Sequence, residues 1–105
     1  MAAALAAGAA DYVMPDLERI GGVTGWQRAA GLAAVHRIKM SSHLYPEVSA
    51  HLLAATPTCH FLEYVDWADA ILDAPLEIVD GCAVRPDQLG NGLRWNDKAV
   101  ERYRV

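Results

Sequence analysis

The sequence has little basic charge, few cysteines and no long apolar segment. Nine Lys and Arg against thirteen acidic residues give a net charge of −4, so we expect no binding to nucleic acid or to an anionic membrane. The longest apolar run, Met1–Ala10, is about half of the ~20 residues that a membrane-spanning helix needs, and it lacks the basic flank of a signal peptide. Cys59 and Cys82 form no CxxC motif and no disulfide framework, which is typical of a cytoplasmic protein.

What the sequence does contain is enough apolar surface to fold. Residues of apolar type make up 53% of the chain and charged residues 21%, a balance that excludes an intrinsically disordered protein. The length of 105 residues suits one ordinary domain. It is also about half of the ~200 residues that a complete (β/α)8 barrel requires.

Apolar segments alternate between short runs and longer periodic stretches, which predicts strands alternating with helices. Thr24 is the expected N-cap of the first long helix, and Pro46 opens the next one. This order predicts an α/β fold built from about three βα units with a parallel sheet, spanning residues 1–74. The predicted strands are 12–14, 38–40 and 59–65, and the predicted helices are 26–37, 48–55 and 67–72.

The pattern changes after Pro75. Two short β-type runs, 76–79 and 82–84, flank Asp80-Gly81, a strong hairpin signal, and a charged helix is predicted over 97–103. Residues 75–105 therefore read as a hairpin and a C-terminal tail. At the other end, the alanine-rich segment 1–10 has neither an N-cap residue nor a polar face, so we expect it to be the last part of a longer helix.

Three ionisable residues follow or end the predicted strands: Asp16, His43 and Glu63. Functional side chains of parallel βα folds gather where strands end, and neighbouring strands lie ~4.8 Å apart. A carboxylate beside an imidazole fixes its tautomer and makes it a better general base. Glu63 lies among apolar neighbours, which would favour its protonated, proton-donating form.

Each of these residues also has a purely structural interpretation. Asp16 could cap a turn, His43 could be an ordinary polar loop residue, and Glu63 could be buried with a structural partner. The coincidence of all three at one edge of the sheet favours a shared catalytic role.

Other candidate sites are weaker. The four histidines have no metal-ligand spacing, so we expect no metal site from them, and the glycines of residues 20–25 lack the pattern of a phosphate-binding loop. The three tryptophans are expected to pack rather than bind bases, and both cysteines are expected to be inert core thiols. The tryptophans are Trp26, Trp67 and Trp95.

Several motifs together resemble a known family. MPD at 14–16, IGGVTGW at 20–26, SSHL at 41–44, SAHLLAATPT at 49–58 and HFLE at 60–63 are similar to the C-terminal part of the mandelate racemase/muconate lactonizing enzyme family, in the enolase superfamily. The stretch 81–95 is similar as well. The resemblance spans nearly the whole chain and implies the C-terminal portion of a (β/α)8 barrel, with residues 1–105 forming a partial barrel domain.

The resemblance also implies roles for the three strand-end residues. His43 matches the general base that moves the α-proton of a carboxylate substrate, Asp16 its orienting partner, and Glu63 the acid that hydrogen-bonds the substrate carboxylate. Members of the family stabilise the resulting enediolate with Mg²⁺. The implied substrate is an α-hydroxy acid or an acid sugar, and racemisation and dehydration both stay open. A full-length member is expected to be a homo-oligomer.

The sequence departs from the family in what it lacks. The three metal-binding carboxylates of earlier strands, the Lys-x-Lys segment and the N-terminal capping domain have no counterpart in these 105 residues. We therefore expect a fragment that binds no metal by itself and is inactive alone. The alternative is an independent, non-catalytic module that self-associates through the open edges of a partial barrel.

Overall fold

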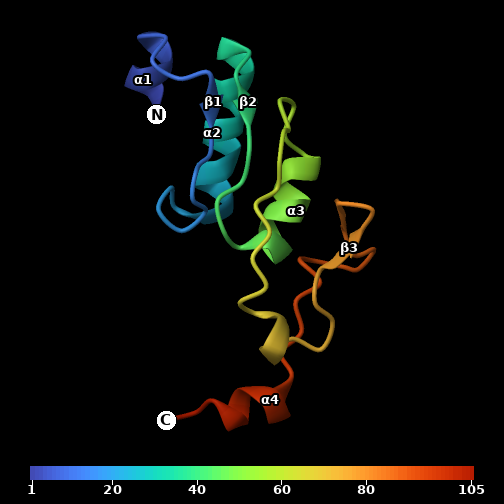
Figure 1. Ribbon diagram of the computed structural model, residues 1–105. Helices are drawn as coiled ribbons and strands as arrows, with labels where there is room; N and C mark the ends of the chain where they lie inside the picture. The colour runs from blue at the N-terminus through green and yellow to red at the C-terminus, as the bar shows by residue number, and fades with distance from the viewer.

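The computed structural model describes all 105 residues and is elongated, with extents of 49 × 33 × 22 Å. Figure 1 shows the two termini at opposite ends of the molecule, with β1 and β2 side by side across α2. No helix is both long and apolar enough to cross a membrane. The elements are α1 (Ala2–Ala6), β1 (Tyr12–Val13), α2 (Gly22–His36), β2 (Lys39–Met40), α3 (Pro46–Ala54), the 3-10 helix η1 (Asp69–Ile71), β3 (Glu77–Val79), β4 (Cys82–Val84) and α4 (Asp97–Arg102).

The first two predicted strands form a parallel pair, and α2 is the crossover between them. Val13 pairs with Met40, and both side chains are buried against the helices. The same register continues past the strands to an isolated parallel bridge between Asp16 and His43. Because side chains alternate between faces, these two residues lie on the face opposite to Val13 and Met40.

The start of α2 was predicted wrongly. The helix begins at Gly22, and its N-cap is Gly21 with a φ of 86°, so Thr24 lies inside the helix and caps nothing. Two consecutive glycines with positive φ let the chain turn directly from the loop after β1 into the helix. An N-cap search based on Ser and Thr misses such a start because the backbone itself provides it.

The third predicted strand, residues 59–65, does not form a regular strand. Met40 and Cys59 make a parallel bridge, in which Met40 donates to Thr58 O and accepts from His60 N. Regular pairing would next join Ser42 N–H to the carbonyl of His60, but it bonds to Phe61 O at 3.0 Å. One extra residue is therefore inserted beside β2, as in a β-bulge.

The aromatic rings of the bulge confirm this irregularity. The ring centroids of His60 and Phe61 are 4.1 Å apart, whereas consecutive side chains of a regular strand point to opposite faces. Beyond the bulge, Leu62 packs against the core, so the next residue, Glu63, faces the side that carries Asp16 and His43. A regular strand in the register of Cys59 would place Glu63 on the helix side instead.

The core lies between the β1–β2 pair and the helices. Trp26 is 1% exposed and its Nε1 donates to Thr56 Oγ1 at 3.0 Å, which joins α2 to the end of α3. The other core members are Leu5, Val13, Leu17, Ala29, Ala30, Ala33, Met40 and Leu53. Of the three tryptophans only Trp26 is buried, so the packing expected of Trp67 and Trp95 is wrong, and Cys59 and Cys82 are exposed rather than core thiols.

The C-terminal third follows the sequence prediction closely. β3 and β4 form an antiparallel hairpin whose turn residues, Asp80 and Gly81, have φ of 49° and 77°, as a type I′ turn requires. Asn96 caps α4 by accepting from Ala99 N. The backbone of residues 94–96 bonds to residues 71–73, which ties α4 to η1.

Two glycines of α2 provide a matched test of this packing. A Cβ at Gly25 would lie 1.7 Å from Ile20 O, whereas a Cβ at Gly31 would meet nothing within 4 Å. We expect Gly25→Ala to lower the free energy of unfolding by about 1–3 kcal/mol or more, because the backbone must move. Gly31→Ala should raise it by about 0.5–1 kcal/mol through helix propensity. Urea unfolding followed by circular dichroism measures both, and equal effects of the two changes would contradict the packing described.

Candidate active site

Asp16 lies in the tight turn that follows β1. Arg19 N donates to its Oδ1 at 3.0 Å, and Ile20 N donates to its backbone carbonyl. These bonds hold the carboxylate at the carboxyl end of β1, with its side chain only 11% exposed. The turn-capping interpretation of Asp16 is therefore correct, and it does not exclude a second role.

The surroundings of Asp16 stabilise its charged form. The backbone N–H of Arg19 contributes most and the bond from His43 comes next, and together they hold the pKa of Asp16 below its ordinary value of 3.8. Asp16 is therefore an ionised carboxylate at neutral pH, which can only accept hydrogen bonds.

His43 contacts this carboxylate from the end of β2. Its Nδ1 lies 2.8 Å from Asp16 Oδ2. Since the carboxylate must accept, Nδ1 carries the proton and donates it, which leaves the lone pair of Nε2 free. The His43 side chain is 36% exposed, so its ring is accessible from the face that it shares with Asp16. A neutral imidazole held in this tautomer is equipped to act as a general base.

The backbone after His43 adopts an uncommon conformation. Leu44 and Tyr45 have φ of 54° and 49°, the left-handed region that non-glycine residues rarely occupy. Tyr45 also donates its hydroxyl proton to Glu18 Oε2, a bond between the loops that follow β2 and β1. This bond raises the pKa of Tyr45, because ionised Glu18 disfavours a neighbouring phenolate.

Glu63 reaches the same site through the left-handed turn. Leu44 N donates to Glu63 Oε2 at 2.7 Å, and Glu63 is half-buried. The expected apolar surroundings are therefore only partly present, and the carboxyl group has a polar partner. Asp16, His43 and Glu63 thus come from three consecutive segments to one end of the β1–β2 pair.

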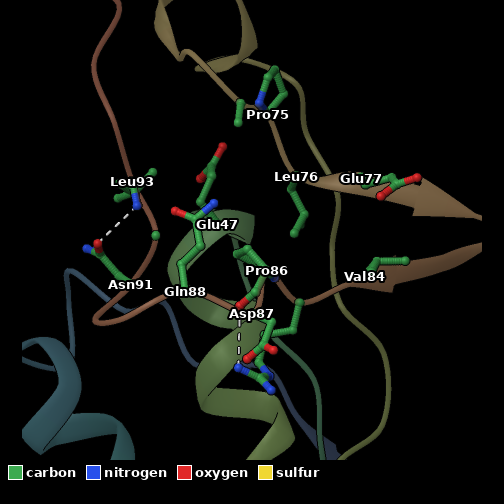
Figure 2. Close-up of a pocket in the computed structure, with 13 residues that line it drawn as sticks. Glu47, Pro75, Leu76, Glu77, Val84, Pro86, Asp87, Gln88, Asn91 and Leu93 are labelled. Carbon is green, nitrogen blue, oxygen red and sulfur yellow. Dashed lines mark hydrogen bonds between the residues drawn. The ribbon is translucent and has the colours of Figure 1, made fainter.

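One cavity beside the C-terminal hairpin does not include these residues. It has a volume of about 390 Å³ and lies between the start of α3 and residues 74–93. Figure 2 shows Glu47 extending toward it from α3, with Gln88 and Asn91 on the loop that closes one side. None of Asp16, His43 and Glu63 lines it.

The residues of this chain do not fit a metal site. No three or more His, Cys, Asp or Glu side chains lie together in a way that could hold an ion. The oxygens of Asp16 are already engaged by Arg19 and His43. The side chains present here therefore do not make a Mg²⁺ site by themselves.

The three ionisable residues could be found from the sequence, but the amide that binds Glu63 could not. The bond from Leu44 N to Glu63 Oε2 gives no pattern that a single sequence reveals. The one available signal was Pro46, which requires a break in the chain before α3.

Comparison with known proteins identifies the family of the chain. Residues 1–99 match the model of the enolase C-terminal domain-like family. The chain belongs to this family. Its relatives include members of the mandelate racemase/muconate lactonizing enzyme family, and the family domain is of the (β/α)8-barrel type.

The curated relatives are longer enzymes. L-talarate/galactarate dehydratase of Salmonella typhimurium is 35% identical over 87% of this chain and 23% of its own length. 3,6-Anhydro-alpha-L-galactonate cycloisomerase of Streptomyces coelicolor is 31% identical over 97% of the chain and 28% of its own length. The chain thus spans about a quarter of the length of the relatives it matches.

Solved structures are more similar still. An enolase from Bradyrhizobium, complexed with magnesium and mandelic acid, superposes with a TM-score of 0.92 and 54% identity over 99% of this chain and 28% of its own. An enolase from the alphaproteobacterium bal199 with bound magnesium has a TM-score of 0.92 and 53% identity over 95% and 28%. The family enzymes use Mg²⁺.

The lowered pKa of Asp16 predicts a pH dependence of stability. Its contribution is fully present above the ordinary value of 3.8 and is lost as the pH falls through the folded-state value. Asp16→Asn should therefore be less stable than the wild type at pH 6, and the difference should shrink at pH 3. Urea unfolding at the two pH values measures this. A difference in the free energy of unfolding between wild type and variant that is the same at both pH values would contradict the bonding described.

Proposed function

We propose that this chain carries the His–Asp base and the acidic group of an enolase-superfamily active site that removes the α-proton of a carboxylate. The observation that carries the proposal is the 2.8 Å contact between His43 Nδ1 and Asp16 Oδ2, which leaves Nε2 free at an accessible edge. The match to the family supports it. The proposed substrate is an α-hydroxy acid or an acid sugar.

In the proposed reaction, Nε2 of His43 takes the α-proton while the electron pair of the broken C–H bond moves toward the carboxyl group. The ring then becomes an imidazolium, which the Asp16 carboxylate stabilises across the Nδ1 bond. Glu63 has Oε2 occupied by the Leu44 amide, so its other oxygen, when protonated, would donate a hydrogen bond to the charge that builds up on the substrate carboxyl. Delivery of a proton to the opposite face of the α-carbon by a group outside this chain completes racemisation. Loss of a β-hydroxyl, which leaves as water with the proton of the imidazolium, gives dehydration.

The names of the relatives support the substrate class. The curated relatives include acid-sugar dehydratases, such as D-gluconate dehydratase of Thermoproteus tenax, and cycloisomerases, such as that for D-galactarolactone from Agrobacterium fabrum. A Polaromonas L-talarate dehydratase was crystallised with L-glucarate. Mandelic acid in the Bradyrhizobium relative is an α-hydroxy acid. All of these ligands or substrates are hydroxylated carboxylic acids or their lactones.

We also propose how the chain is divided. Residues 1–74 supply about three βα units of the barrel, the third reduced to the bulged segment beside β2, and residues 75–105 supply the hairpin and tail. The full assembly is a homo-oligomer that holds Mg²⁺ with residues outside this chain. The 105 residues alone are inactive, because they present a base and an acid but no metal ligands.

A self-associating module is the second candidate, and one observation favours it. Tyr12 lies on the face that carries the Asp16–His43 dyad, and Phe61 lies in the bulge beside it. These residues are 58% and 69% exposed, so they leave an apolar surface open beside unpaired strand edges. Sedimentation velocity distinguishes the candidates: a discrete oligomer supports the module, and a monomer or a broad distribution of aggregates supports the partial active site.

A chimera tests the proposed chemistry. Residues 1–105 would replace the matched region of the Bradyrhizobium relative, and exchange of the mandelate α-proton would be followed by NMR in D2O for both enantiomers. We expect the chimera to exchange the proton, the isolated chain not to, and His43→Asn to lower exchange of at least one enantiomer by about 10²–10⁴-fold.

His51→Asn is the matched control, since His51 is in α3 and its Nε2 contacts the Asn91 backbone carbonyl. It should leave the exchange rate unchanged. A chimera that folds and exchanges the proton equally well with and without His43 would reject the proposed base.

A further inference from the structure

Two serines beside the site are completely buried without a role in the chemistry described. Ser42 and Ser49 are both 0% exposed, and burying a hydroxyl is costly unless it is hydrogen-bonded. Neither contacts Asp16 or His43 through its hydroxyl. Both hydroxyls instead bond to groups that surround Glu63.

Ser42 holds the backbone of Glu63. Its Oγ accepts from Glu63 N at 3.0 Å, and its own N–H donates to Phe61 O at 3.0 Å. These two bonds replace the regular pairing that the segment would otherwise make with β2. They stabilise the inserted residue, and the inserted residue turns Glu63 toward the face that carries His43.

Ser49 holds the amide that binds the Glu63 carboxylate. Its Oγ donates to Leu44 O at 3.0 Å, and its N–H donates to Tyr45 O at 2.8 Å. Both acceptors belong to the left-handed residues before α3, a conformation that persists only when its surroundings support it. The carbonyl and the N–H of Leu44 belong to the two peptide groups that meet at its Cα. The bond from Ser49 that holds the carbonyl therefore restricts the directions in which Leu44 N–H can point.

We propose that Ser42 and Ser49 are positioning residues for Glu63, the first through its backbone and the second through the partner of its carboxylate. The chain of bonds runs from Ser49 Oγ to Leu44 O, from Leu44 N to Glu63 Oε2, and from Glu63 N to Ser42 Oγ. The catalytic meaning of this arrangement rests on the proposed function. The arrangement itself is a property of the folded chain.

The Leu44 amide is the reporter for the test. In Ser42→Ala and in Ser49→Ala of the full 105-residue chain, its proton resonance should move toward that of Glu63→Gln, in which an amide replaces the carboxyl group that accepts from Leu44 N–H. Its hydrogen exchange should become about fivefold faster, the size expected for loss of one supporting hydrogen bond. The cysteine variants of both serines, which are close to isosteric but bond weakly, should shift the resonance in the same direction if the alanine variants fail to fold.

Thr56→Val is the matched control. Thr56 is also buried, and its hydroxyl accepts from Trp26 and donates to Leu52 O, but it has no bond to the Glu63 network. It should lower the free energy of unfolding and leave the Leu44 amide resonance in place. A Leu44 amide that is unchanged in the serine variants, or that moves equally in Thr56→Val, would overturn the proposal.

The outcome is separable from that of the proposed function. If the Leu44 amide responds as expected while the chimera exchanges no α-proton, the serines position Glu63 and the catalytic assignment fails. If the chimera is active and the Leu44 amide does not respond, the positioning role fails alone.

Discussion

The inserted residue beside β2 is the constraint on which the arrangement of the site depends. Up to Cys59 the segment pairs with Met40 as a regular parallel strand would, and after Phe61 it is displaced by one position. Since side chains alternate along an extended chain, a displacement of one residue exchanges the two faces. Leu62 thereby reaches the core and Glu63 the side of the dyad, from a sequence whose regular pairing would do the opposite.

The rest of the site follows from an undisturbed register. Val13–Met40 and Asp16–His43 are the same parallel pairing three residues apart, so one set of backbone bonds places a core contact on one face and the dyad on the other. The turn after β1 then holds Asp16 ionised through the Arg19 amide. An ionised acceptor determines which nitrogen of His43 carries the proton. Backbone geometry thus decides the chemistry available to the imidazole.

Much of this could be predicted from the sequence, for identifiable reasons. Short apolar runs separated by a periodic helix identified β1, β2 and the two helices, and Asp80-Gly81 identified the hairpin because the I′ turn demands such residues. The predicted strand ends alone place Asp16 and His43 at one edge of the sheet. Their contact follows from the register of β1 and β2, because the pairing of Val13 with Met40 on the buried face also brings Asp16 opposite His43.

What failed was governed by the backbone or by tertiary contacts. The bulge at His60–Phe61 depends on hydrogen bonds between residues about 20 positions apart. The start of α2 depends on the backbone of two glycines, and the left-handed Leu44–Tyr45 pair is a conformation that neither residue type favours. The exposure of Cys59, Trp67 and Trp95 could not be read from local hydropathy either, because it depends on which faces of the sheet and hairpin are covered.

The central claim is that Asp16 holds His43 with its proton on Nδ1 and its Nε2 lone pair free. The ¹⁵N chemical shifts of the His43 ring distinguish the two neutral tautomers directly in the intact chain. We predict a protonated Nδ1 and an unprotonated Nε2 in the wild type, and a mixture of tautomers in Asp16→Asn. A neutral wild-type ring with its proton on Nε2 would contradict it.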